Sequence, residues 1–245
     1  SRAMIGGRYI QEASNNKPPF HRYNSIDRQL YFSSNHISSK NAKYYADALE
    51  KHRPDYLVGI SSSWALLAHF FKEQGIRPPS PRAILCSSDA LTKEGKQIIE
   101  EVFRARAYNA WSMAESCGLI SECESGSFHA TPEMGIIEII NHDGIAVKGE
   151  PGRIICTGLL NKNQPLIRYD TGDLAQVSNN QKCSCGREMP KYNRIVGRLD
   201  EYVWSKDGRA STRLARVWRG IDTIREGQIV QKTLDDIHVN ISVRN

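Results

Sequence analysis

The segment PLIRYDTGDLA, residues 165–175, concentrates charged side chains between two apolar flanks. Arg168 precedes two carboxylates, Asp170 and Asp173, and the pair Thr171-Gly172 between them predicts a tight turn. A carboxylate can accept hydrogen bonds from the two neighbouring hydroxyls of a ribose, and an arginine can balance a phosphate. The alternative is an Arg–Asp pair on an ordinary hairpin, with Thr-Gly as its turn. Both interpretations stay open on these residues alone.

Two cysteines, Cys183 and Cys185, lie one residue apart in the polar stretch NNQKCSCGRE, and ECESGSFH upstream adds Cys123 and His129. Three sulfur ligands and one nitrogen match a closed, structural tetrahedral zinc site, which would tie two distant segments together. The alternative is that cysteines serve as small buried hydrophobic residues. That alternative fits the three cysteines in apolar contexts, Cys86, Cys117 and Cys156.

Apolar periodicity predicts the elements that must position these residues. Helices are expected over residues 39–52, 61–75 and 91–103, the last capped by Thr92, and strands over 55–60, 82–88 and 105–111. Strands that alternate with helices form parallel sheets with right-handed crossovers. Residues 1–37 are polar and turn-rich and are expected to form loops around short strands. We therefore predict an α/β fold with a parallel β-α-β core.

Small polar residues follow each predicted parallel strand, and parallel sheets bind ligands beyond these carboxyl ends. The three stretches are 61–63, 87–89 and 112–115, and Asp89 and Glu115 are their carboxylates. The serines have an alternative role as caps of the following helices. Glu115 is compatible with a Mg²⁺ ion bound to a phosphate, and equally with a first-turn glutamate that favours a helix dipole.

After residue 134 the pattern changes to short strand-like segments separated by Gly, Asn and Asp turns. This pattern predicts a small antiparallel β-barrel or sheet. Residues 211–221 are then expected to form a helix, and two strands are expected within residues 227–243.

Composition excludes several classes of protein. The net charge of +6 and the pI near 9.0 favour anionic ligands, but there is no long Lys/Arg run and no nucleic-acid-binding motif. No apolar stretch approaches the roughly 20 residues that span a bilayer. Six cysteines without an export signal predict reduced thiols and a cytoplasmic location. The sequence leaves the oligomeric state open.

PLIRYDTGDLA and RIVGRLDE together resemble the paired signature of adenylate-forming (acyl-CoA synthetase-like) enzymes. These enzymes activate a carboxylic acid with ATP to an acyl-AMP and pass the acyl group to a thiol, often coenzyme A. The segment ECESGSFH, together with CSCGREMPKYNRIVGRLD, resembles the phenylacetate–CoA ligase branch, and SKDGR with IREGQIVQ is similar to its CapK-like members. The resemblance covers nearly the whole chain.

The resemblance implies a role for each matched position. Asp173 would bind the ribose hydroxyls, Arg198 would lie near ribose and phosphate, and Asp200 would be the hinge of a carboxy-terminal lid. Glu115 would be the magnesium-associated carboxylate. The remaining nucleotide-binding positions would be Ser87, Ser88 and Asp89 at the adenine and Trp111 and Ser112 before Glu115. The implied zinc ligands are Cys123, His129, Cys183 and Cys185, and the implied walls of the acid pocket are Trp64, His69 and Trp111.

The chain departs from the family pattern in the motif WSMAE. Ser112 stands at a glycine position and Ala114 at a hydroxyl position. The resemblance also predicts a phosphate loop and a lid lysine that this chain lacks, since Lys206 is at the wrong place. We therefore expect the carboxy-terminal portion of a ligase, with part of the adenylate-forming core over 1–134, a β-barrel part with the zinc staple over 135–197, and a hinge and partial α+β lid over 198–245.

The expected function is an ATP-dependent ligase for an aryl or other small carboxylic acid, with AMP as product and coenzyme A as acceptor, although the chain alone would be a poor catalyst. Two alternatives remain. One is a nucleotidyl transferase on the same scaffold that leaves AMP on its substrate. The other, motivated by the missing loop and lysine, is a non-catalytic, zinc-stapled binding or scaffold fragment.

Overall fold

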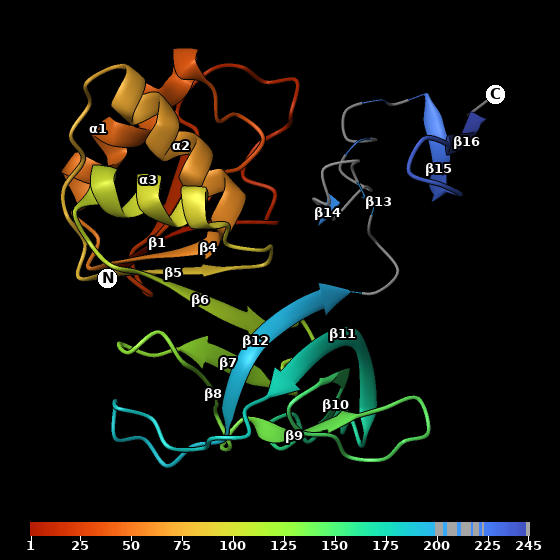
Figure 1. The fold of residues 1–245 in the computed structure, drawn as a ribbon. Helices are drawn as coiled ribbons and strands as arrows, with labels where there is room; N and C mark the ends of the chain where they lie inside the picture. The colour runs from red at the N-terminus through yellow and green to blue at the C-terminus, as the bar shows by residue number, and fades with distance from the viewer. Residues whose placement is uncertain (199–202, 205–209, 212–216, 218–220, 222, 244–245) are drawn as a thin grey trace.

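The structure is a computed structural model, and it describes residues 1–198, 203–204, 210–211, 217, 221 and 223–243. Twelve of the described strands form one mixed sheet, and two further pairs of strands lie in the carboxy-terminal region (Figure 1). The α/β class predicted from the sequence is confirmed. Asp200 and most of the predicted helix over 211–221 lie outside the described residues.

The first half of the sheet is parallel. Its strands are β1 (Arg2–Gly6), β3 (Gln29–Ser33), β4 (Tyr56–Ile60), β5 (Ala83–Ser87) and β6 (Ala107–Ser112), in the order β3-β1-β4-β5-β6. An edge strand, β2 (His21–Asn24), pairs antiparallel with β3. The predictions of β4, β5 and β6 are confirmed. Residues 1–37 contain short strands between loops, as predicted, and one of them, β1, is a central strand of this sheet.

Three described α-helices join these strands: α1 (Ala42–His52, after the 3-10 turn η1, Ser39–Asn41), α2 (Ser61–Glu73) and α3 (Lys93–Phe103). The connections through α1, α2 and α3 run in the same direction along the sheet, from β3 to β4, from β4 to β5 and from β5 to β6, and the helices gather on one face of the sheet (Figure 1). Their apolar faces and the strands share one core, which includes Trp64, Phe71 and Phe103. Thr92 caps α3 as predicted, since its side chain accepts a hydrogen bond from Gly95 N at 3.0 Å.

Strand β6 also begins the antiparallel half of the sheet. From β6 the order continues through β7 (Leu119–Glu122), β8 (Phe128–Ala130), β12 (Lys191–Arg198), β11 (Tyr169–Val177), β10 (Pro151–Gly158) and β9 (Gly135–Ile140). A second core packs within this half, with Ile120, Ile154, Ala175 and Tyr192 among its members. The pairing of the described strands ends at β9, so it gives an antiparallel sheet and does not confirm the predicted barrel.

The carboxy-terminal strands form two antiparallel pairs: β13 (Val203–Trp204) with β14 (Ala210–Ser211), and β15 (Ile224–Gln231) with β16 (Ile237–Val243). The two strands predicted within residues 227–243 are therefore confirmed. Within the described part of the chain, no helix is both long enough and apolar enough to cross a bilayer.

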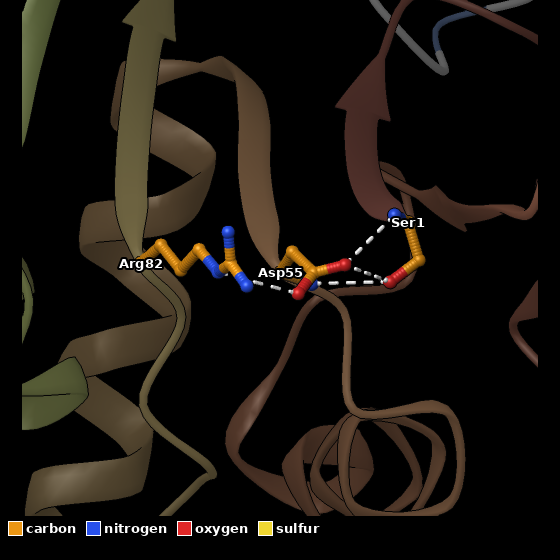
Figure 2. Close-up of polar contacts among 3 residues, drawn as sticks. All are labelled: Ser1, Asp55 and Arg82. Atoms are coloured by element: carbon orange, nitrogen blue, oxygen red, sulfur yellow. Dashed lines mark hydrogen bonds and ion pairs between the residues drawn. The ribbon is translucent and has the colours of Figure 1, made fainter.

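The amino ends of the parallel strands are held by polar contacts around Asp55, just before β4. The Ser1 hydroxyl donates to Asp55 Oδ2 at 2.9 Å, and Arg82 Nε lies 3.6 Å from Asp55 Oδ1 (Figure 2). The contacts join the starts of β1, β4 and β5. The opposite, carboxyl edge of the same strands carries the candidate site.

Candidate functional site

Asp173 meets Trp111 at the carboxyl end of β6. The indole Nε1 of Trp111 donates a hydrogen bond to Asp173 Oδ2 at 3.1 Å, although the residues are far apart in the sequence. Both side chains are half-buried. The contact brings a carboxylate of the antiparallel half to the strand end of the parallel half, which is the edge where parallel sheets bind ligands.

A bulge in β11 produces this orientation. The register between β10 and β11 jumps so that residues 171–173 face Ile154 alone. Gly172 has a φ of 72°, a left-handed conformation that favours glycine. The hydroxyl of Thr171 donates to Ile154 O at 3.0 Å and accepts from Asp173 N at 3.2 Å. The predicted tight turn at Thr171-Gly172 is therefore wrong, because these residues form a bulge within a continuous strand. The bulge changes the direction in which the Asp173 side chain points.

Arg168 and Asp170 do not pair with each other. Arg168 Nε lies 3.2 Å from a carboxylate oxygen of Glu138, and Asp170 Oδ2 lies 2.5 Å from Arg153 Nη1. The alternative of an Arg–Asp pair across a hairpin is therefore wrong. Asp170 is instead tied to β10, which pairs with β11, and Arg168, just before β11, is tied to β9 at the edge of the sheet.

Glu115 lies in the turn between β6 and β7, where its exposed carboxylate accepts a hydrogen bond from the Tyr169 hydroxyl at 3.0 Å. The alternative of a first-turn helix residue is wrong, because antiparallel β7 follows and no helix begins here. The tyrosine was not singled out in the sequence. Its position two residues before the bulge in RYDTGD was the available signal.

The ends of β4 and β5 are joined by Asp89. Its carboxylate accepts from Ser62 N at 3.2 Å and from the Ser62 hydroxyl at 2.5 Å, and the buried Ser61 hydroxyl donates to Asp89 O at 3.0 Å. Asp89 thus accepts from the amino end of α2. The alternative that the serines cap this helix is wrong, because the hydroxyls of Ser61 and Ser62 donate to Asp89 and the N-cap residue, Ile60, makes no side-chain cap. Ser87 and Ser88 lie beside it, and Ser88 has a φ of 67°.

Two further predicted residues lie at the same edge. The Ser112 hydroxyl donates to Gly118 O at 3.1 Å, so it closes the turn that carries Glu115. Arg198 ends β12, and its backbone is the register partner of Asp173. The predicted hinge, Asp200, lies outside the described residues.

Two of the three residues expected to wall the acid pocket lie elsewhere. Trp64 is fully buried in the α/β core, and its indole donates to Val58 O at 2.9 Å. His69 is exposed on α2 and lies 3.1 Å from Glu73. The aromatic residue in SSSW belongs to the inward face of an amphipathic helix, which explains why Trp64 is core and His69 faces outward.

The four predicted zinc ligands come together. Their ligand atoms all lie within 4.8 Å of one another, with Cys123 Sγ 3.9 Å from Cys183 Sγ and Cys185 Sγ 3.5 Å from His129 Nε2. The hairpin β7–β8 supplies Cys123 and His129, and the loop between β11 and β12 supplies the other two. Three thiols and one imidazole are the donor set of a closed zinc site.

The surroundings of this cluster suit a cation. His129 Nδ1 lies 3.2 Å from Met189 O, so Nε2 faces the thiols, as in metal-bound histidines. The pKa of Cys183 falls from 9.0 to about 5, because the Ser127 hydroxyl, the Cys185 backbone and His129 support its thiolate. By contrast, burial raises the pKa of the remote Cys86 and Cys156 to about 12. As predicted, Cys86, Cys117 and Cys156 are buried.

No family model matches the chain. The fold is similar to part of solved acid–CoA ligases: 2-hydroxyisobutyryl-CoA ligase, in complex with R3-HIB-AMP, matches with a TM-score of 0.60 at 21% identity, over 82% of this chain and 45% of that one. The anthranilate CoA ligase AuaEII with anthranoyl-AMP matches with a TM-score of 0.54 at 13% identity, over 83% and 41%.

Sequence comparison then points to a particular branch. The chain is 27% identical to Protein CapK of Staphylococcus aureus in an alignment 248 residues long, which covers 100% of this chain and 54% of CapK. It is 26% identical over 167 residues to the phenylacetate-coenzyme A ligase of Thermus thermophilus, covering 63% of this chain and 36% of that protein. The chain thus spans about half, or less, of these relatives. The predicted resemblance to the phenylacetate–CoA ligase and CapK-like branch of the adenylate-forming superfamily is confirmed.

Proposed function

We propose that this chain is the AMP-binding portion of an ATP-dependent acid–thiol ligase. The ligase would convert a small or aryl carboxylic acid to an acyl-AMP and transfer the acyl group to coenzyme A. The observation that carries the proposal is the contact between Trp111 and Asp173, because it sets a carboxylate at the carboxyl edge of the parallel strands. The likeness to acid–CoA ligases in fold and sequence supports the same reading.

In this proposal Asp173 accepts hydrogen bonds from the two ribose hydroxyls. The Trp111 N–H occupies Oδ2 from one side and so fixes the orientation of the carboxylate before the nucleotide arrives. Arg198, opposite Asp173 in the ladder, would lie near the ribose and phosphate. Ser87, Ser88 and Asp89 would line the adenine side, with Asp89 also keeping its contact to α2.

Glu115 is proposed as the carboxylate that holds Mg²⁺ with the nucleotide phosphates. Carboxylate oxygens are ligands that Mg²⁺ prefers, and Glu115 is exposed at the strand edge and oriented by Tyr169. When bound, the ion would neutralise phosphate charge. Ala114, which replaces the usual hydroxyl residue, removes a hydroxyl that would reach a phosphate, and the hydroxyl that Ser112 adds donates to Gly118 O.

The cysteine cluster is proposed as a structural zinc site. Four protein ligands would fill the tetrahedral coordination of zinc and leave no position for catalysis. Zinc there would join hairpin β7–β8 to the loop that precedes β12. Because β12 carries Arg198 and pairs with β11, the ion would stabilise the strand pair that presents Asp173.

Two measurements test the function. The first is a calorimetric titration that measures the binding of a non-hydrolysable acyl-AMP analogue to the chain. The second is incubation of the protein with ATP, Mg²⁺, coenzyme A and a panel of small and aryl acids, with pyrophosphate release and product masses recorded. Thioester together with free AMP supports the ligase, and AMP retained on the product supports a nucleotidyl transferase. If the chain binds no adenylate, the proposal is wrong, and the alternative of a zinc-stapled scaffold is favoured.

A further inference from the structure

A hollow of about 360 Å³ opens at the amino edge of the parallel strands, opposite the edge that carries Asp173. Three arginines line it, and each comes from a segment that precedes a strand: Arg53 before β4, Arg77 before β5 and Arg104 before β6. Its volume is within the range of about 300–1,000 Å³ that small-molecule sites occupy. The hollow is therefore separate from the proposed nucleotide site and large enough for a small ligand.

The residues that line this hollow carry a net positive charge, three arginines against one glutamate. Glu50 is the one acidic side chain among its lining residues, and it pairs with Arg53. Arg104 donates to two main-chain oxygens, Pro78 O at 2.6 Å and Val102 O at 3.2 Å, and these contacts fix the guanidinium without neutralising it. Among the described residues, no carboxylate lies within ion-pair distance of the exposed Arg77.

The hollow is also rigid. The segment RPPSP, residues 77–81, forms one wall, and its prolines restrict the backbone before any ligand arrives. Arg53 and Arg104 both end their helices in the left-handed conformation, with φ of 40° and 50°. Glycine would adopt that conformation without strain, as Gly75 does after α2. Two helices thus end in an arginine at a position where glycine would cause less backbone strain, and both arginines line the same hollow.

We propose that this hollow binds a small molecule through a phosphate group. Guanidinium groups match phosphate oxygens with a planar set of donors, and the two that no carboxylate of the lining neutralises, Arg77 and Arg104, suit a dianion better than a single carboxylate. The competing explanation is that arginines only balance the negative ends of α1 and α3. That explanation covers Arg53 and Arg104, but not Arg77, which lies in the loop after α2.

Inorganic phosphate is the probe, titrated at constant ionic strength and followed by the backbone amide signal of Ser80, which lines the hollow. Arg77→Ala should weaken binding about tenfold, the effect of losing one charged hydrogen-bonding group. Arg82→Ala is the matched control, because Arg82 lies at the same edge, carries the same charge and contacts Asp55 instead (Figure 2). It should leave phosphate binding unchanged.

Three results would overturn the proposal: no saturable change at Ser80, equal weakening by Arg77→Ala and Arg82→Ala, or tighter binding of citrate than of phosphate. Equal weakening would mean diffuse attraction of anions to a basic edge, and preference for citrate would assign the hollow to carboxylates. Arg77 is exposed and makes no ion pair among the described residues, so its substitution should leave the fold intact.

Discussion

The indole N–H of Trp111 and the carboxylate of Asp173 are hydrogen-bonded at 3.1 Å across the junction between the parallel and antiparallel halves of the sheet. Trp111 lies on β6, which pairs with both halves. Asp173 reaches it because the bulge at Thr171-Gly172 turns β11 locally. The affinity for a ligand held by Asp173 would therefore depend on both the register of β11 and the indole of Trp111.

Asp173→Asn is expected to weaken binding of an acyl-AMP analogue by about 10- to 100-fold, because a neutral amide replaces a charged acceptor of the ribose hydroxyls. Calorimetric titration measures the effect. Asp170→Asn is the control, since Asp170 lies in the same segment but pairs with Arg153. Equal affinity of the Asp173→Asn variant and the parent protein would remove Asp173 from the site.

Trp111→Phe keeps an aromatic ring on β6 and removes the N–H that orients Asp173. We expect a smaller loss of affinity, of about three- to tenfold, as for one neutral donor. A double-mutant cycle with Asp173→Asn isolates the coupling. If the two losses simply add, the indole does not act through Asp173.

Cys183→Ser should remove bound zinc and lower the melting temperature together, because the cluster would lose one of its four ligands. Metal analysis and thermal unfolding measure the two effects. Cys86→Ser is the control: Cys86 is buried in the α/β core, so its substitution should lower stability without changing metal content. Zinc-free parent protein, or full zinc content in Cys183→Ser, would contradict the metal assignment.

Glu122→Gln should destabilise the chain by roughly 2–4 kcal/mol, since it breaks a largely buried ion pair and leaves Lys96 uncompensated. Lys96 Nζ lies 2.7 Å from Glu122 Oε1, and the glutamate side chain is 10% exposed. Glu122 also accepts from Asn109 N at 2.9 Å. Urea unfolding measures the change in free energy. Glu101→Gln breaks the exposed pair with Lys72, and it should cost no more than about 0.5 kcal/mol.

Stability should fall as the pH is lowered from near 7.5 to near 5, in part through His21 and His52. Their rings lie 6.0 Å apart. Burial lowers both pKa values below 6.5; His52, Lys51 and Arg22 lower that of His21 further, and Lys51 also lowers that of His52. Each histidine binds its proton more readily in the unfolded chain, so its stabilising contribution is present above pH 6.5 and is lost as the pH falls through the folded pKa.

His52→Gln should therefore flatten the pH dependence of the free energy of unfolding, measured with urea at both pH values. His142→Asn is the control, because His142 is exposed on a distant turn beside Asp143. An unchanged pH dependence in His52→Gln would show that other groups dominate in this range.

The local elements of the parallel half followed from the sequence, because each helix has one apolar face and each strand is a short apolar run between turn residues. The antiparallel half was harder. Hairpin β7–β8 is short and lies among polar residues, so pairing with distant strands stabilises it more than local preference does; the same holds for the short strand β1 of the parallel half. Trp64 shows that residue type alone is not sufficient. A tryptophan is suited to the wall of a pocket, but the packing of α2 places this one in the core.

The sequence by itself determined the donor set of the cysteine cluster and the motif that carries Asp173, since both depend on residue types at fixed spacing. Only the tertiary structure decided which groups meet. Thr171-Gly172 became a bulge because β10 and β12 hold β11 as a strand on both sides, and Arg168 and Asp170 took partners on other strands. Such choices depend on long-range pairing, which residue spacing along the chain does not encode.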